Sequence, residues 1–103
     1  DSFKNCCQKQ FHNSEFNVSE LASEMAMSVR SLQRVATATV GQSPSELLRN
    51  YRLNRAHDKL TEGLSVTATY LDCGFKSASY FSRAFKDFMG ASPQHFQKTQ
   101  AEH

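Results

Sequence analysis

Two short stretches of this chain carry side chains suited to the recognition of base pairs. An arginine offers two parallel donors that match the two acceptors of guanine, and a glutamine pairs in the same way with adenine. Alanine can contact the methyl group of thymine, and serine can donate or accept a hydrogen bond. Helical spacing would place each set on one outward face. The candidate reading faces are Arg30, Gln33, Arg34 and Thr37 in the first stretch and Ala78, Ser79, Ser82, Arg83 and Lys86 in the second.

Both stretches lie inside a unit that occurs twice. Residues 18–44 and 66–93 each open with Val, pass through a turn of small residues, carry Arg34 or Arg83 midway and close on Gly-x-Ser-Pro. The offset between the units is 48 residues at the opening Val and 49 at the closing Gly, so the second unit has gained one residue in its turn. A duplicated helical unit with an arginine on its second helix is typical of a tandem DNA reader.

Helix signals dominate the chain and strand signals are absent, which predicts an all-α fold. Ser43-Pro44-Ser45-Glu46 is the clearest helix start, because it combines a capping box with proline in the first turn. We expect one domain over residues 1–103, with about seven helices arranged as two helix-turn-helix subdomains on a long linker helix. The predicted segments are a first helix near 3–12, a first helix-turn-helix at about 17–41, the linker at about 44–61, a second helix-turn-helix at about 65–90 and a short last helix from Ser92-Pro93.

The same periodicity predicts which side chains form the core. A modest core is expected, because small domains bury a smaller share of their surface. The predicted core positions are Leu48, Leu53, Ala56 and Leu60 in the linker; Val29, Leu32 and either Val35 or Ala36 in the first reader helix; Tyr80, Phe81, Ala84, Phe85 and Phe88 in the second; and the reduced thiol of Cys73.

Residues near the turns and on the linker are suited to contact with the DNA backbone. Helix N-termini present backbone donors to phosphate, so the helix starts at Ser28 and Ser77 are candidates. A linker of this length spans about 27 Å, which fits two readers in successive major-groove segments about 34 Å apart. The other candidates for phosphate contact are the basic residues Arg49, Arg52, Lys76 and Lys86.

The net charge is small but unevenly distributed. The whole chain has a formal charge of +2, whereas positions 30–86 contain nine basic and four acidic residues, an excess of five. The positive charge is thus concentrated where the repeats lie, as expected for a nucleic-acid partner.

Other classes of site lack the necessary residues. Three cysteines are an odd number, which argues against a disulfide framework, and the four histidines have no zinc-ligand spacing. No nucleophile-elbow pattern, signal peptide or apolar run of about 18 residues is present. We therefore expect no enzyme, metal or cofactor and a reducing, cytoplasmic setting. The first residue is not Met, which suggests a fragment of a longer protein.

These units resemble the AraC/XylS family of bacterial transcription regulators. The second unit has Gly-Phe at 74–75, Ser-Tyr-Phe-Ser-Arg-Ala-Phe-Lys at 79–86 and Gly-Ala-Ser-Pro at 90–93, and the first adds Leu-Gln-Arg at 32–34. The resemblance spans about residues 3–98. It implies a two-headed, sequence-specific reader of double-stranded DNA, usually fused to a separate sensing or dimerising domain. It assigns base contacts to Arg30, Gln33, Arg34, Ala78, Ser79, Tyr80 and Arg83.

Three positions depart from the family pattern. Thr69-Tyr70 stands where an apolar residue and Ala are usual, Ala36 stands where Phe is usual, and Ala78 is small for a reading position. Tyr70 is large enough to fill part of the space lost elsewhere. Because Ala78 offers no hydrogen bond, we expect the second head to read bases more weakly and to depend more on phosphate contacts.

Several features have a second interpretation. Arg83 can form a structural ion pair with Asp72 or Asp87, Tyr80 can belong to the core, and the linker arginines can serve only solubility. The alternative for the whole chain is a helical protein-interaction module that has kept the fold but lost DNA contact, with an apolar exposed face. RNA polymerase is a further expected partner of a DNA reader, and we expect the isolated domain to be a monomer.

Overall fold

The computed structural model describes residues 2–101, and over this range it contains seven α-helices and no β-strand. The predicted all-α fold is therefore confirmed. The helices are α1 (Ser2–Gln10), α2 (Val18–Glu24), α3 (Val29–Val40), α4 (Pro44–Thr61), α5 (Val66–Asp72), α6 (Ala78–Met89) and α7 (Pro93–Ala101).

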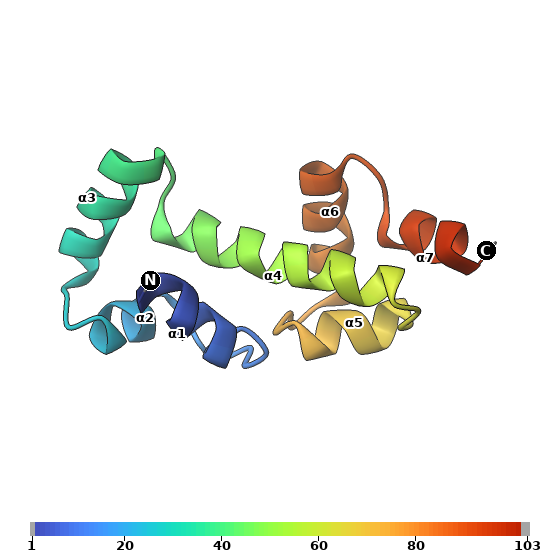
Figure 1. Cartoon of the computed structure of the whole chain (residues 1–103), viewed down its shortest axis with the longest axis horizontal. Coiled ribbons are helices and arrows are strands. Elements are labelled where there is room, and N and C mark those ends of the chain that lie inside the picture. The colour runs from blue at the N-terminus through green and yellow to red at the C-terminus, as the bar shows by residue number, and fades with distance from the viewer. Residues whose placement is uncertain (1, 102–103) are drawn as a thin grey trace.

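The longest helix, α4, is the axis on which both halves of the molecule pack. Its N-cap Ser43 accepts a hydrogen bond from the backbone of Glu46 (3.2 Å), and the Glu46 carboxylate accepts one from the backbone of Ser43 (3.1 Å). Figure 1 shows α2 and α3 at one end of α4, α5 to α7 at the other, and α3 and α6 projecting to the same side. We call α2–α3 the first head and α5–α6 the second head. The molecule is 46 Å long and 24 by 23 Å across.

Each helix of the two heads starts at a capping side chain. Asn17, Ser28, Ser65 and Ser77 each accept a hydrogen bond from the backbone N–H three residues later. At Asn17 only one half of a capping box is formed. Glu20 donates its backbone N–H to Asn17 (3.0 Å), but the described residues include no bond from Asn17 back to the Glu20 carboxylate.

Two apolar clusters hold the heads against α4, and they differ in composition. The first is mainly aliphatic, whereas the second contains a layer of aromatic rings: Phe81 lies 5.0 Å from Phe75 and 5.5 Å from Phe85, centroid to centroid. All four predicted core residues of the linker are buried. The clusters consist of Cys7, Phe16, Leu21, Ala22, Leu32 and Leu48, and of Leu53, Ala56, Leu60, Cys73, Phe75, Phe81 and Phe85.

Some side chains predicted for the core lie at the surface instead. Ala36 faces inward with 7% exposure while Val35 is 50% exposed, which decides between the two alternatives. Phe88 is 39% exposed, so the prediction that it is buried was wrong. Tyr80, for which the sequence left both core packing and base contact open, is 46% exposed. The cause is that the apolar stripe of α6 is wider than the strip its neighbours cover.

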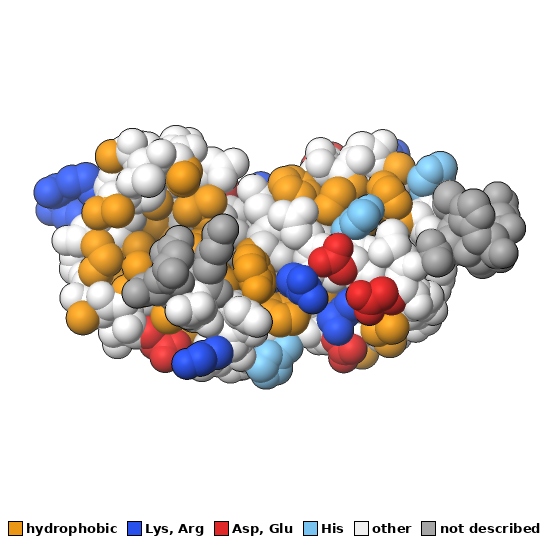
Figure 2. Space-filling model, viewed as in Figure 1, with side chains coloured by type: hydrophobic (Ala, Val, Ile, Leu, Met, Phe, Trp, Pro, Cys, Tyr) orange, Lys and Arg blue, Asp and Glu red, His pale blue; other side chains and the backbone are white. Residues whose placement is uncertain are grey.

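Ala36 and Phe85 occupy equivalent positions in the two heads, and the smaller side chain borders an open groove. This apolar groove has a volume of about 570 Å³, and its lining includes Val35, Ala36 and Phe88. Figure 2 shows apolar side chains gathered on this face over α3 and the adjoining part of α4. Tyr70 does not fill the space, because it packs in the second cluster with its ring 6.1 Å from that of Phe81.

The residue gained by the second unit lies directly before α6. The same backbone bond closes both turns, from the N–H of Met27 (2.9 Å) or Phe75 (3.0 Å) to the carbonyl five positions earlier. In the first turn the N-cap follows Met27 at once. In the second, Lys76 separates Phe75 from the N-cap Ser77. Lys76 is therefore the insertion.

Candidate nucleic-acid interface

The outward face of α3 is open to solvent. Arg30, Gln33 and Arg34 are all exposed, while Leu32 and Ala36 on the opposite side hold the helix against its cluster. Within the described part of the chain, neither arginine forms an ion pair. The fold thus brings the three residues predicted from the sequence onto one accessible face, with their donors directed to solvent as base reading requires.

The equivalent face of α6 is also exposed but carries fewer long donors. Ala78, Ser79 and Arg83 are all accessible. No acidic side chain of the described residues lies within 4.0 Å of Arg83, so the alternative ion pair with Asp72 or Asp87 is not formed. Arg83 is consequently available to an external acceptor.

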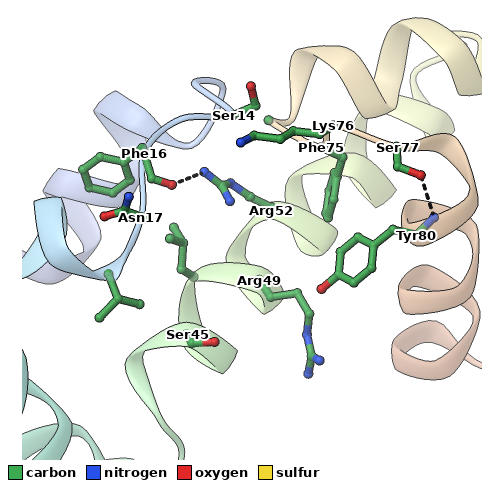
Figure 3. Close-up of a pocket in the computed structure, with 13 residues that line it drawn as sticks. Ser14, Phe16, Asn17, Ser45, Arg49, Arg52, Phe75, Lys76, Ser77 and Tyr80 are labelled. Carbon is green, nitrogen blue, oxygen red and sulfur yellow. Dashed lines mark hydrogen bonds between the residues drawn. The ribbon is translucent and has the colours of Figure 1, made fainter.

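Tyr80 lies at the edge of the α6 face. The sequence left two roles open for it, core packing and base contact, and its position is compatible with both. Its ring is 6.2 Å from that of Phe75, yet almost half of the residue is exposed. Figure 3 shows the phenol directed toward the space that also holds Arg49 of α4. A hydroxyl in this position can donate to or accept from a molecule entering between the heads.

The two reader N-termini differ in how their serine hydroxyls are used. Ser28 accepts from the backbone of Ser31 (3.0 Å) and also donates to its hydroxyl (3.0 Å). Ser77 accepts from the backbone of Tyr80 at 3.2 Å. Both residues are therefore helix caps in this structure. A phosphate there would be bound chiefly by first-turn backbone N–H groups.

Arg52 is engaged inside the protein, which argues against its predicted role in phosphate contact. Its Nε donates to the carbonyl of Phe11 (3.0 Å), and its Nη2 donates to the carbonyls of Asn13 (2.9 Å) and Phe16 (3.0 Å). Burial lowers the pKa of this guanidinium, although arginine remains charged in proteins. Sequence patterns do not reveal this engagement, because the acceptors are backbone carbonyls 36 to 41 residues away.

A cleft of about 410 Å³ separates the two heads on one side of α4 (Figure 3). Arg49 lines it, and the Nε of Arg49 is buried without a hydrogen-bond partner among the described residues. Lys76 reaches across from the second head to Glu15 at 3.4 Å. Arg49 is partly accessible and Lys76 is largely accessible, so the cleft is basic and open. Its lining also includes Ser14, Asn17, Ser45, Ser77 and Tyr80.

Lys86 lies exposed on α6, next to Arg83 on the reading face. It has no acidic side chain within 4.0 Å in the described region. Its position suits the predicted phosphate contact. The sequence did not indicate that Ser14, Asn17 and Ser45 line one cleft, because residues far apart in the chain share no periodic signal.

Other chemistry finds little support in the described residues. Burial raises the pKa of the Cys7 and Cys73 thiols to about 11, so neither is a reactive thiolate near neutral pH. No group of three or more potential metal ligands is assembled in residues 2–101. None of the described helices combines the length and apolarity that a membrane span requires.

Comparison with known proteins places the whole arrangement in one family. A family model described as a helix-turn-helix domain matches residues 21–99. The transcriptional regulator ArgR of Pseudomonas aeruginosa is 34% identical over 76 residues, which is 73% of this chain and 23% of that protein. The transcriptional activator RhaS of Mannheimia succiniciproducens is 34% identical over 82 residues, 78% of this chain and 30% of that protein. The chain therefore spans less than a third of the length of either relative.

Solved structures share the fold over nearly the full chain. A DNA-binding transcriptional dual regulator from Escherichia coli K-12 superposes with a TM-score of 0.87 at 26% identity, covering 99% of this chain and 91% of that one. The DNA-binding domain of AdpA, a global transcriptional factor solved in complex with a target DNA, gives a TM-score of 0.86 at 26% identity. That match covers 97% of this chain and 90% of AdpA's.

Proposed function

Because this chain belongs to the AraC/XylS family of helix-turn-helix DNA-binding domains, we propose that it reads one double-stranded operator with both heads. The observation that carries the proposal is the pair of exposed faces on α3 and α6, projecting to the same side of a single helix (Figure 1). Two faces mounted in this way fit successive major-groove segments, about 34 Å apart along the duplex. The AdpA domain, solved on its target DNA, supports a DNA partner.

The contacts divide into those that read sequence and those that hold the backbone. On α3, Arg30, Gln33 and Arg34 read base edges. On α6, Arg83 reads and its neighbours make smaller contributions. The remaining proposed base contacts are Ala78, Ser79 and Tyr80, and the proposed phosphate contacts are Arg49, Lys76, Lys86 and the helix starts at Ser28 and Ser77.

In the cell this domain would be the output end of a bacterial transcription regulator, as the names of its relatives support. Since the chain spans only part of those relatives, a separate sensing or dimerising domain is a further proposed part of the protein. RNA polymerase is the proposed partner for activation, the cytoplasm the proposed location, and the isolated domain a proposed monomer.

The test is selection of bound duplexes from a random pool, followed by a salt titration of the selected duplex against a scrambled one. We expect an enriched motif of about 15–20 base pairs with two half-elements one helical turn apart. Strong salt dependence without any enriched motif would reduce the domain to a non-specific phosphate binder.

The apolar groove beside Ala36 is the one observation that favours the alternative, a protein-interaction module. Val35 and Phe88 expose apolar surface there. This groove lies on the opposite side of α3 from Arg30 and Arg34, so the two functions do not compete for one face. A domain that bound no duplex at low salt, but bound a protein with little salt dependence, would support the module.

A further inference from the structure

The loop before the first head and the turn of the second head meet at one joint, and Arg52 contacts both. The segment that leads from α1 into the first head contributes the carbonyls of Phe11, Asn13 and Phe16, all bound by the Arg52 guanidinium. The same arginine stands on α4, which carries both heads. One side chain therefore ties the loop before α2 to the shared axis through three hydrogen bonds.

The turn of the second head closes on the other side of this arginine. Gly74 has a φ of +81°, and a Cβ at this position would overlap the carbonyl oxygen of Phe11 and lie 3.0 Å from the Nε of Arg52. Only glycine combines this backbone conformation with so close an approach. The first head's loop, the linker and the second head's turn thus converge at a single point.

Two more contacts surround the joint. Lys76, the residue inserted in the second turn, pairs with Glu15 of the first head's loop at 3.4 Å. The ring of Phe11 packs against the second apolar cluster and lies 5.7 Å from Tyr51, which packs against the first. The loop at 11–16 therefore touches both halves of the molecule.

We propose that Arg52 is a positioning residue that locks the two heads into one relative orientation and so sets the spacing that the operator's half-elements must have. This inference rests on the proposed function, because it concerns how the two readers are presented to one duplex. A guanidinium suits the task, since its planar fork reaches several carbonyls at once where a lysine would satisfy fewer. Without the clamp, the loop and turn would be free to shift about α4.

The joint itself is tested without DNA. Spin labels are attached at the equivalent exposed positions of α3 and α6, through Ala38→Cys and Asp87→Cys in a Cys6→Ser background, and the distance distribution is measured. We expect one narrow distribution, and a broader one after Arg52→Gln. Arg55→Gln is the matched control, because it removes the same charge from an exposed position on the same helix. Equal widths in all three proteins would overturn the joint.

The consequence for DNA is tested with the operator selected above, its half-elements moved apart by up to about half a turn, roughly 5 base pairs. The wild type and Arg55→Gln should lose about tenfold or more in affinity over this series. Arg52→Gln should lose about threefold or less, while its affinity for a single half-element stays within about twofold of wild type. Arg52→Lys should behave like Arg52→Gln.

Three results would contradict the inference in distinguishable ways. If Arg52→Gln weakened all duplexes equally, lowered the salt slope and kept the spacing preference, and Arg52→Lys restored binding, Arg52 would be a phosphate contact. If the wild type showed no spacing preference, the two-headed function would fail, and the label distances would still report on the joint. If Arg52→Gln did not fold, Glu15→Gln provides the second test: an unchanged distance distribution and spacing profile would count against the joint.

Discussion

The two heads share their backbone design but differ in how their reader helices are anchored. The same hydrogen bond closes both turns, and the αL residue is Ala26 (φ 56°) in the first and Gly74 (φ 81°) in the second. At one equivalent position of the two reader helices, however, the first head has Ala36 and the second head has Phe85. Local geometry is thus repeated while the core behind it has diverged.

This difference separates reading from anchoring. The second head fixes α6 with two fully buried Phe rings but offers mostly small side chains to bases. The first head fixes α3 with Leu32 and Ala36, yet presents Arg30, Gln33 and Arg34. We expect the second head to be the more rigid and the first to provide more of the sequence discrimination.

The sharpest test of this contrast is Phe85→Ala. Removing a fully buried ring should reduce the free energy of unfolding by about 3–5 kcal/mol. The matched change in the first head, Ala36→Gly, should cost only about 1 kcal/mol, mainly from helix propensity. Urea unfolding of both variants decides the matter, and similar losses would mean that the two cores bear equally on stability.

Loss of either arginine should relax the sequence preference in a different half-element of the operator. Arg34→Ala and Arg83→Ala should each cost about 1–3 kcal/mol of binding free energy and relax one base position. We expect the larger loss from Arg34, because Arg30 and Gln33 work beside it. Repeating the duplex selection with each variant measures the effect, and relaxation in the same half-element for both would contradict the assignment of one head to each.

Lys86 should contribute affinity without sequence information. Its equivalent in the first head is the uncharged Thr37, so this contact belongs to the second head alone. Lys86→Gln should weaken selected and scrambled duplexes alike, and the slope of log K against log salt should fall by about 0.9. A change confined to the selected duplex would instead make Lys86 a base reader.

Filling the groove should make the core packing of the first head more like that of the second. Ala36→Leu directs its added methyl groups toward the groove and should stabilise the protein by about 1 kcal/mol. Ala36→Ser, which adds no apolar volume, is the control for the change of residue. Thermal or urea unfolding provides the measurement, and a destabilised Leu variant would show that α3 is already closely packed.

The smallest expected effect is on the pH dependence of stability. It concerns the starts of α4 and α7, the helices that follow the two heads. Hydrogen bonds from Ser43, first from its backbone and then from its side chain, hold the pKa of Glu46 below its usual value. His95 occupies the equivalent position of α7. A lowered carboxyl pKa contributes stability that is present above the unfolded chain's pKa and lost as pH falls through the folded one. Urea midpoints measured between about pH 5 and 3 should therefore fall more in the wild type than in Glu46→Gln; parallel curves would refute this.

Much of the site was readable from the sequence because reader helices are local objects. The caps at Ser28 and Ser77 and the exposed positions of Arg34 and Arg83 follow from hydrogen bonds and periodicity within a few residues. Periodicity was less informative about how much of a helix's apolar face the neighbouring helices cover. It marked Phe88 as apolar but not that neighbouring helices leave it 39% exposed.

The sequence by itself therefore determined the all-α fold, the helix starts and the two exposed faces that carry the candidate base contacts, since each depends on residues close together in the chain. Only the tertiary structure decided the role of Arg52, because its acceptors lie 36 to 41 residues earlier and come within reach only when the first loop folds against α4. It also decided why glycine is required at position 74. Ala26 makes the same left-handed turn in the first head, but at Gly74 the carbonyl of Phe11 occupies the place that a Cβ would take.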